Sequence, residues 1–572
     1  MQNLYPRLAP ALLPIIELLF MASAGLLILR SQLRADKSAA SDRTSAFHFL
    51  GHHFNLIAAP KRFAVFAVGF GVLAVRVALI PLLGIPEPRF HDEFSYLLAG
   101  DTFAHRHLTN PTHPMWIHFE SFHIIEHPTY MSMYPPAQGL VLAAGQVLGR
   151  PWIGQLFITA AMCSVLCWML QAWFPPRWAL LGAVLAALRL GILSYWMNTY
   201  WCASVAALGG ALVLGAWPRL RKRPAAGTAV LMGIGLIILA NSRPYEGFVF
   251  SLPVAGFMLT WLAGRQRPPW SQSLTRVVLP ISAVLVIGAM ATGYYYSRVT
   301  GSPFLMTYVV NRQQYAAAPY FVWQTPRPEP VYHHSVMRDY YRWELQEFER
   351  NLTLTGYIER GLGKLTGWWR FYLGPLLTVP LFSLPWLVRR RRMLLPLLLC
   401  CAMVGAFAVQ TWTFPHYFSP ATGALYILLV EGLRCLWAWR RNRRLGQAVV
   451  RAAPVIACAM IILRVGAVAG HVQIEPAWPR GNLERASVVN QLRQLPGQHL
   501  VVIRYGAHPD KDLEWVWNRA SIDDAKVVWA RDMGESGNQE LLQYFKNRQV
   551  WQINADDPSP KLEGYGITPS EK

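Results

Sequence analysis

The feature that most constrains this chain is a long series of apolar segments separated by short basic connections. A membrane-spanning helix needs roughly 20 apolar residues, and many segments approach that length. We expect spans at 8–29, 63–84, 153–173, 178–193, 201–217, 227–240, 246–263, 276–296, 372–388, 393–410, 420–437 and 449–468. The segment 134–149 is shorter and begins with a Pro-Pro pair, so it is interpreted as a partial helix, with a full crossing as the alternative. The sequence predicts an α-helical polytopic membrane protein with about 12–13 transmembrane helices.

The composition excludes most other classes of protein. Hydrophobic residues make up 53% of the 572 residues and charged residues only 15%, whereas soluble domains carry about 25% charged residues. A net charge of +22 would also suit a nucleic-acid partner. However, the basic residues form short clusters between apolar runs, which is typical of cytoplasmic loops. We therefore expect membrane lipids, and no nucleic acid, as partners.

The basic clusters also predict the orientation. Placing 30–37, 61–62, 219–223, 265–267, 389–392 and 440–444 in the cytoplasm follows the positive-inside rule. This leaves five segments on the outer side: 85–133, 241–246, 294–371, 411–419 and 471–572. We expect an integral protein of the bacterial inner (cytoplasmic) membrane with its C-terminal domain on the periplasmic side.

Two parts follow from this pattern. Residues 1–470 form the predicted transmembrane domain, with 85–133 as its first outer loop and 294–371 as a second, long outer loop. Residues 471–572 form a small soluble α/β domain. Its predicted elements are a helix near 483–495, strands at 499–505 and 526–530, a helix at 538–547 and a strand at 549–554.

The first outer loop holds the candidate chemistry. Asp92 and Glu93 lie a few residues beyond a predicted membrane helix. A carboxylate near low dielectric costs free energy unless it is paired or functional, and its pKa tends to rise, as a general base requires. The alternative is an exposed acidic pair that caps a helix at 93–105.

Seven histidines lie in the same loop, at 91, 105, 107, 113, 118, 123 and 127. Imidazole plus carboxylate is a common metal ligand set, but the spacings match no standard zinc pattern. Histidines that line a polar pocket or contact phosphate are the other interpretation. No cofactor is therefore assigned, the metal ligands stay unknown, and a divalent cation remains an open alternative.

These motifs carry a resemblance. An Asp-Glu pair after an early span, then an aromatic-rich helix, then Tyr134-Pro135-Pro136 opening the next apolar segment, resemble the GT-C superfamily of membrane glycosyltransferases. Within it, roughly 60–440 is similar to the protein O-mannosyltransferase and lipid A aminoarabinose transferase type. Members often have Lys or His where this chain has Tyr134. The stretch 195–201 lacks the second acidic residue that many members carry.

The resemblance implies transfer of a sugar from a polyprenyl-phosphate carrier to an acceptor at the outer face, with inversion. Asp92 would be the base and Glu93 would assist it, with His91 and Tyr134 beside the substrate. The acceptor is a protein, a lipid or a glycan. The first rival is a secondary transporter of a small polar or lipid-linked solute, and the second is a non-catalytic scaffold.

The carrier phosphate would need cations at the outer boundary of the membrane. Arg243 and Tyr245 lie in one short outer loop and His416 and Tyr417 in another. Arg243 could instead pair with Glu246 or extend to lipid headgroups. Two further candidates, which could also contact lipid headgroups, precede the 372–388 span: Lys364 and Arg370.

Overall fold

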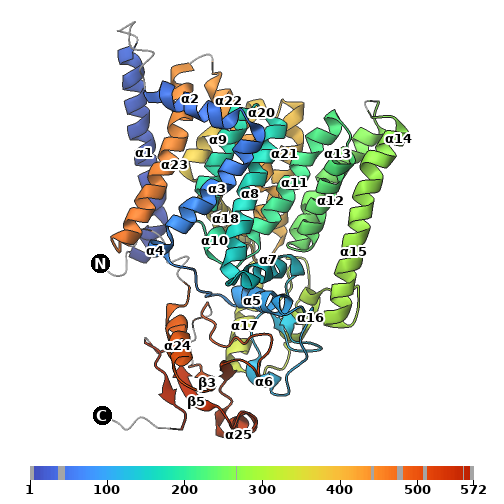
Figure 1. Cartoon of the computed structure of the whole chain (residues 1–572), viewed down its shortest axis with the longest axis vertical. Coiled ribbons are helices and arrows are strands. Elements are labelled where there is room, and N and C mark those ends of the chain that lie inside the picture. The colour runs from blue at the N-terminus through green and yellow to red at the C-terminus, as the bar shows by residue number, and fades with distance from the viewer. Residues whose placement is uncertain are drawn as a thin grey trace.

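The structure is a computed structural model that describes residues 5–35, 46–265, 267–439, 443–472, 474, 481–506, 510, 512–557 and 559–566. A helical bundle forms one end of the molecule and a small α/β unit the other, with the loops that follow the early helices between them (Figure 1). The helical membrane fold expected from the sequence is thus confirmed.

Long apolar runs build the bundle, because a helix satisfies its own backbone hydrogen bonds without water. Its helices are α1 (Tyr5–Ala35), α2 (Ala46–Ala58), α3 (Lys61–Ala78), α4 (Ile80–Leu83), α8 (Pro151–Trp173), α9 (Pro176–Ala186), α11 (Ala203–Lys222), α12 (Ala226–Ala240), α13 (Pro244–Ala263), α14 (Trp270–Ser273), α15 (Leu279–Thr300), α19 (Gly374–Thr378), α20 (Leu384–Leu387), α21 (Leu394–Val409), α22 (Thr422–Trp437) and α23 (Arg443–Ala469).

Fewer helices than expected have the length and composition of a full span. Six helices of the described chain qualify, or seven if the bent pair 51–58 and 61–78 counts as one. Several expected spans are divided by irregular turns instead. The turn η1 (Ala187–Gly191), which is π-helical, follows α9 inside 178–193, and η3 (Val379–Ser383) lies inside 372–388. By contrast, η2 (Leu274–Val278) and η4 (Arg391–Met393) lie at the starts of two of the full-length helices. The number of about 12–13 crossings therefore stays a prediction.

The segment 134–149 forms α7 (Pro136–Val147). At 1.5 Å per residue its 12 residues span about 18 Å, short of the roughly 30 Å hydrocarbon core. The interpretation as a partial helix is confirmed. The helix packs on α8 so closely that a Cβ on Gly145 would lie 2.2 Å from the Gly154 nitrogen.

Shorter elements cover the end of the bundle that carries the α/β unit. They are α5 (His91–Ala104), α6 (Trp116–Phe119), β1 (Ile124–Ile125), β2 (Met131–Ser132), α10 (Tyr195–Asn198), α16 (Thr307–Tyr315), α17 (Ser335–Arg350), α18 (Leu354–Tyr372) and η5 (Pro415–Ala421). The helix α17 lies inside the long connection 294–371. The basic connections next to α14 and α20 lie at the opposite end (Figure 1).

The C-terminal unit has the elements expected from its sequence. They are α24 (Leu483–Gln494), β3 (His499–Arg504), β4 (Val527–Arg531), α25 (Gly534–Tyr544), β5 (Gln549–Asn554) and a short β6 (Glu563–Gly564). The strand order is β4-β3-β5-β6, with β3 parallel to both of its neighbours and β6 antiparallel to β5. Four consecutive apolar residues of β3 (500–503) are buried, so both faces of the sheet are covered.

Candidate active site

Helix α5 places Asp92 at its second residue, at the end of the bundle. The helix begins there because the Glu93 carboxylate accepts hydrogen bonds from the backbone N–H groups of Arg89 (3.0 Å) and Phe90 (3.2 Å). Its other oxygen accepts from the Tyr200 N–H at 3.1 Å. Glu93 is buried and joins the start of α5 to the turn before α11. The sequence suggested a catalytic role for Glu93, whereas these contacts favour a positioning role.

The hairpin of β1 and β2 supplies the partners of Asp92. Antiparallel pairing of Ile124 with Ser132 continues into a hydrogen bond from Met133 N–H to the His123 carbonyl (3.1 Å). The Ser95 hydroxyl donates to the same carbonyl at 2.6 Å and so ties the hairpin to α5. His123 and the residue after Met133, Tyr134, therefore lie together over the helix start.

Three side chains surround the Asp92 carboxylate. His123 Nδ1 lies 2.6 Å from Asp92 Oδ1, and the Tyr134 hydroxyl donates to the same oxygen. His91 Nδ1 lies 3.1 Å from His123 Nδ1 and 3.9 Å from Asp92 Oδ1. The structure thus brings together three residues that the sequence singled out (Asp92, His91 and Tyr134) and adds His123.

The pKa of Asp92 differs from the sequence expectation. Burial acts to raise the pKa of Asp92, but His123 outweighs it through its charge and hydrogen bond, with His91 assisting, and the pKa lies well below its ordinary value. The expected rise was wrong, because the sequence did not reveal the partners. Burial lowers the pKa of His123 against the opposing effect of Asp92. Asp92 is thus an ionised, oriented carboxylate at neutral pH.

Arg243 lies directly before the first residue of α13. The sequence left open whether it contacts the carrier phosphate, pairs with Glu246 or extends to lipid headgroups. Its guanidinium lies 2.7 Å from the Glu246 carboxylate and 3.7 Å from the centre of the Tyr417 ring. The pairing with Glu246 is confirmed, but it uses only part of the guanidinium. The Arg243 Nε is buried and has no hydrogen-bond partner among the described residues.

Tyrosines connect Arg243 with Asp92. The Tyr308 ring lies 5.4 Å, centre to centre, from the Tyr134 ring, whose hydroxyl binds Asp92. Burial raises the pKa of Tyr308, and the charges of both Arg243 and Asp92 also act on that hydroxyl. Both charged groups therefore lie near enough to Tyr308 to influence its hydroxyl.

His416 lies against the same region from η5. Its ring centre lies 4.5 Å from that of Trp201, and its Nδ1 lies 3.3 Å from the Tyr195 hydroxyl. Burial, reinforced by the charge of Arg243, holds the pKa of His416 well below its ordinary value. His416 is therefore a neutral imidazole beside Tyr417. Tyr245 packs edge-on against Phe321.

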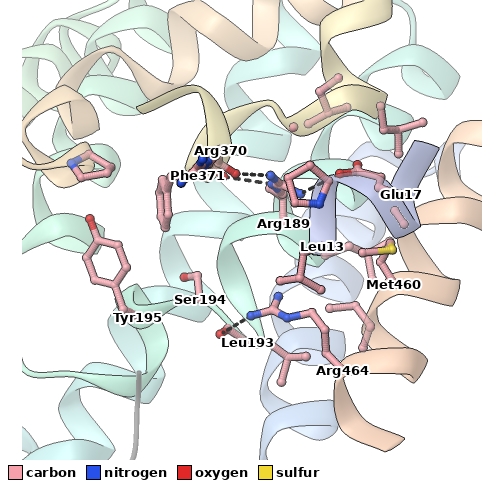
Figure 2. A pocket seen from close by; sticks show the side chains of 18 of the residues that line it. Leu13, Glu17, Arg189, Leu193, Ser194, Tyr195, Arg370, Phe371, Met460 and Arg464 are labelled. Carbon is pink, nitrogen blue, oxygen red and sulfur yellow. Dashed lines mark hydrogen bonds and ion pairs between the residues drawn. The ribbon is translucent and has the colours of Figure 1, made fainter. Parts of the chain in front are cut away.

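The two cations near the 372–388 span lie elsewhere. Lys364 Nζ donates to the carbonyls of Phe407 (3.3 Å) and Gln410 (2.5 Å). The Gln410 side chain in turn donates to Glu246 at 3.1 Å, and Glu246 pairs with Arg243. Lys364 is therefore connected to Arg243 through Gln410 and Glu246. Arg370 lines a separate cavity between α1 and α23, and its carbonyl accepts a hydrogen bond from Arg189 (Figure 2).

One group of side chains could hold a metal ion. Ligand atoms of His91, Asp92 and His123 all lie within 4.8 Å of one another. Two imidazole nitrogens and a carboxylate oxygen form a donor set that suits Zn²⁺ and leaves a position open. The other histidines of the loop lie elsewhere; His113, for example, binds Asp523 of the C-terminal unit at 3.1 Å.

The sequence itself matches no protein-family model and no curated protein. Solved structures do match. ArnT from Cupriavidus metallidurans bound to undecaprenyl phosphate gives a TM-score of 0.50 at 14% identity over 86% of this chain and 92% of that chain. An Archaeoglobus fulgidus oligosaccharyltransferase in complex with Zn and sulfate gives a TM-score of 0.48 at 13% identity, over 86% of this chain and 67% of that chain. The chain has a GT-C fold. At such low identity the likeness shows the fold alone.

Sequence reasoning missed several residues around this GT-C fold's candidate site. His123 was one of seven equivalent histidines, and its backbone φ of 61° has no sequence signal. Tyr340 of α17 lies 5.0 Å, ring centre to ring centre, from His91 and covers the site. The density of tyrosines in 294–371 was the only signal for Tyr308 and Tyr340.

Proposed function

We propose that this chain is a glycosyltransferase that moves a sugar from a polyprenyl-phosphate carrier to an acceptor at the outer face of the membrane. One observation carries the proposal. Asp92 is an ionised carboxylate, and Arg243 is a buried guanidinium whose Nε has no hydrogen-bond partner among the described residues; the charges of both act on Tyr308 at the end of a membrane bundle. The GT-C fold supports it, because the similar ArnT structure is one bound to undecaprenyl phosphate.

Each group has a role in this proposal. Asp92, with His123 beside it, orients the acceptor O–H or N–H and receives its proton as the acceptor atom attacks the anomeric carbon. The bond between that carbon and the phosphate oxygen breaks, and the polyprenyl phosphate leaves with the electron pair. Arg243 stabilises the added negative charge through its free Nε. Attack from the face opposite the phosphate inverts the anomeric carbon.

A divalent cation would be held by His91, Asp92 and His123. When bound, such an ion would supply positive charge next to the acceptor atom. Burial lowers the pKa of His123 and so favours its neutral imidazole. Burial also acts to lower the pKa of His91, but the hydrogen bond and charge of Asp92 outweigh it and raise that pKa, so His91 would have to lose its proton to hold the ion. Tyr134 donates to the same Asp92 oxygen that His123 contacts. We also propose the bacterial inner membrane, with the C-terminal unit on the periplasmic side, as the location. The acceptor is a protein, a lipid or a glycan.

The proposal is tested with Asp92→Asn in the purified full-length protein. Undecaprenyl phosphates carrying mannose or aminoarabinose serve as donors, with a membrane extract as the source of acceptors. We expect release of undecaprenyl phosphate to slow by at least about 100-fold, with carrier binding retained. Asp339→Asn on α17 is the matched control, because the Asp339 side chain is 45% exposed and pairs with Arg338 at 3.3 Å.

Two outcomes would contradict the proposal. Unchanged release in Asp92→Asn would remove Asp92 from catalysis. Passage of intact labelled carrier across proteoliposomes, with no sugar transfer, would favour the transporter instead.

A further inference from the structure

A cavity of 380 Å³ lies between α1, η1, α19 and α23, separate from the centre at Asp92 and Arg243. Ionisable side chains line one part of it: Glu17, Arg189, Arg370 and Arg464 (Figure 2). The rest of the lining is largely apolar, with leucines from α1, α9, η1 and α19 and Met460 from α23. Its size is within the usual range of pockets for small molecules, about 300–1,000 Å³.

The protein itself holds one of the arginines in place. Arg189 lies 3.8 Å from the Glu17 carboxylate and donates to the carbonyls of Phe371 (2.9 Å) and Arg370. The backbone of Gly374 lies close against this ion pair. A Cβ atom at this position would lie 2.6 Å from Glu17 Oε2, so there is no room for a larger side chain. The ion pair thus forms part of the cavity wall.

The other two arginines approach the cavity from different helices. Arg464 extends from α23 and donates to the Leu193 carbonyl at 3.2 Å (Figure 2), and Arg370 extends from the end of α18. Three arginines and one glutamate therefore line the cavity. Such a lining favours an anion, since a phosphate oxygen can accept charge-assisted hydrogen bonds from several guanidinium groups at low dielectric.

Apolar walls next to this cationic part favour a ligand with a hydrocarbon chain. Leu13 of α1 and Met460 of α23 lie on the walls that the two neighbouring helices contribute (Figure 2). Both helices have apolar surfaces, with Leu19 and Ile462 exposed, so a chain can continue from the cavity along them into lipid. The charged and apolar parts together match a lipid that carries a phosphate.

We propose that this cavity binds the phosphate head of an anionic membrane lipid, as a site distinct from the proposed donor site. It shares a wall with that site, because Tyr195 and Trp201 line the cavity and also contact His416. A bound lipid would brace the helix α1 against α23 and support the wall behind His416. The binding does not depend on sugar transfer.

Native mass spectrometry of the full-length protein in detergent tests this site. The probes are phosphatidylglycerol, phosphatidylcholine, undecaprenyl phosphate and inorganic phosphate. We expect retention of phosphatidylglycerol over phosphatidylcholine, and only weak binding of inorganic phosphate because it lacks a chain. Arg464→Gln and Arg370→Gln should each weaken phosphatidylglycerol binding about tenfold.

Control variants separate charge, fold and site. Arg451 also lies on α23, but its guanidinium lies 5.5 Å from the centre of the Trp437 ring. Arg451→Gln removes one positive charge, as Arg464→Gln does, and should bind phosphatidylglycerol normally. Arg464→Lys should restore much of the binding if Arg464→Gln folds poorly. Undecaprenyl phosphate should be retained equally by wild type and Arg464→Gln.

Three results would overturn the proposal. The first is equal retention of phosphatidylglycerol and phosphatidylcholine by the wild type. The second is unchanged phosphatidylglycerol binding in both glutamine variants. The third is a loss of undecaprenyl phosphate, instead of phosphatidylglycerol, in Arg464→Gln, which would make the cavity part of the donor site.

Discussion

At the scale of the single residue, the neighbouring side chains of Asp92 determine its pKa. His123 is the largest influence that lowers the pKa of Asp92 against burial, so the carboxylate stays charged at pH values below its ordinary pKa. In His123→Gln this influence is lost and the pKa of Asp92 should rise. The acid limb of the pH profile of kcat/KM should therefore move to higher pH, measured with the undecaprenyl-phosphate donors above.

The control for this prediction is His113→Gln. His113 lies in the same loop but binds Asp523 at 3.1 Å, away from Asp92. Its acid limb should coincide with that of the wild type. An unmoved acid limb in His123→Gln would mean that protonation of Asp92 does not limit the reaction.

The sequence identified Asp92 but could not identify its partners. Seven histidines follow in one loop, and only the register of the β1–β2 hairpin decides which of them reaches the helix start. That register depends on long-range packing of Ile124 and Ile125, both buried, which local patterns do not encode. The direction of the Asp92 pKa shift was wrong for the same reason, because it depends on these contacts.

At the scale of the element, Glu93 determines where α5 begins. Glutamine can accept at one end of its amide only, whereas Glu93 accepts from Tyr200 with one oxygen and from Arg89 and Phe90 with the other. Glu93→Gln should therefore lower the free energy of unfolding by roughly 1–3 kcal/mol. Thermal unfolding followed by tryptophan fluorescence measures this change, with the exposed Glu349→Gln as control.

The pH dependence of the free energy of unfolding tests the same prediction in a second way. Burial raises the pKa of Glu93 to about 7 from the model-peptide value of 4.5, against the three backbone N–H donors. The fold therefore binds a proton that the unfolded chain releases, so this contribution to stability falls as the pH rises from 4.5 to about 7. The difference from Glu93→Gln should be larger at pH 5 than at pH 8. A constant difference would contradict the assignment.

Elements were predictable where periodicity is local. The strands β3 and β5 begin at the predicted residues, because short runs rich in β-branched and aromatic residues define them. The spans around 178–193 and 372–388 were predicted as continuous, yet they break at η1 and η3. Hydropathy does not register such breaks, because the residues stay apolar while the backbone changes its hydrogen bonding.

At the scale of the whole molecule, the loop that carries Asp92 (85–133) lies between the bundle and the C-terminal unit (Figure 1). Several hydrogen bonds join loop and unit. Asp101 at the end of α5 accepts from the Ala520 N–H at 2.8 Å, and the Tyr130 hydroxyl donates to the Asn518 carbonyl at 2.9 Å. The C-terminal unit thus helps to fix the loop that carries Asp92, which no local sequence pattern indicated.

Arg531 of β4 is the centre of this contact, and its loss should release the loop. Its Nε donates to the Glu120 carbonyl at 2.6 Å and its terminal nitrogen to Glu514 at 3.0 Å, with both side chains of that ion pair 1% exposed. Arg531→Met leaves the Glu514 carboxylate buried without its cation, which should cost roughly 3–5 kcal/mol. Hydrogen exchange should then show weaker protection in β4 and in α5, together with slower transfer. Adding Glu514→Gln removes the buried charge and should recover part of the stability, whereas a single variant as protected as the wild type would show that the C-terminal unit does not hold the loop.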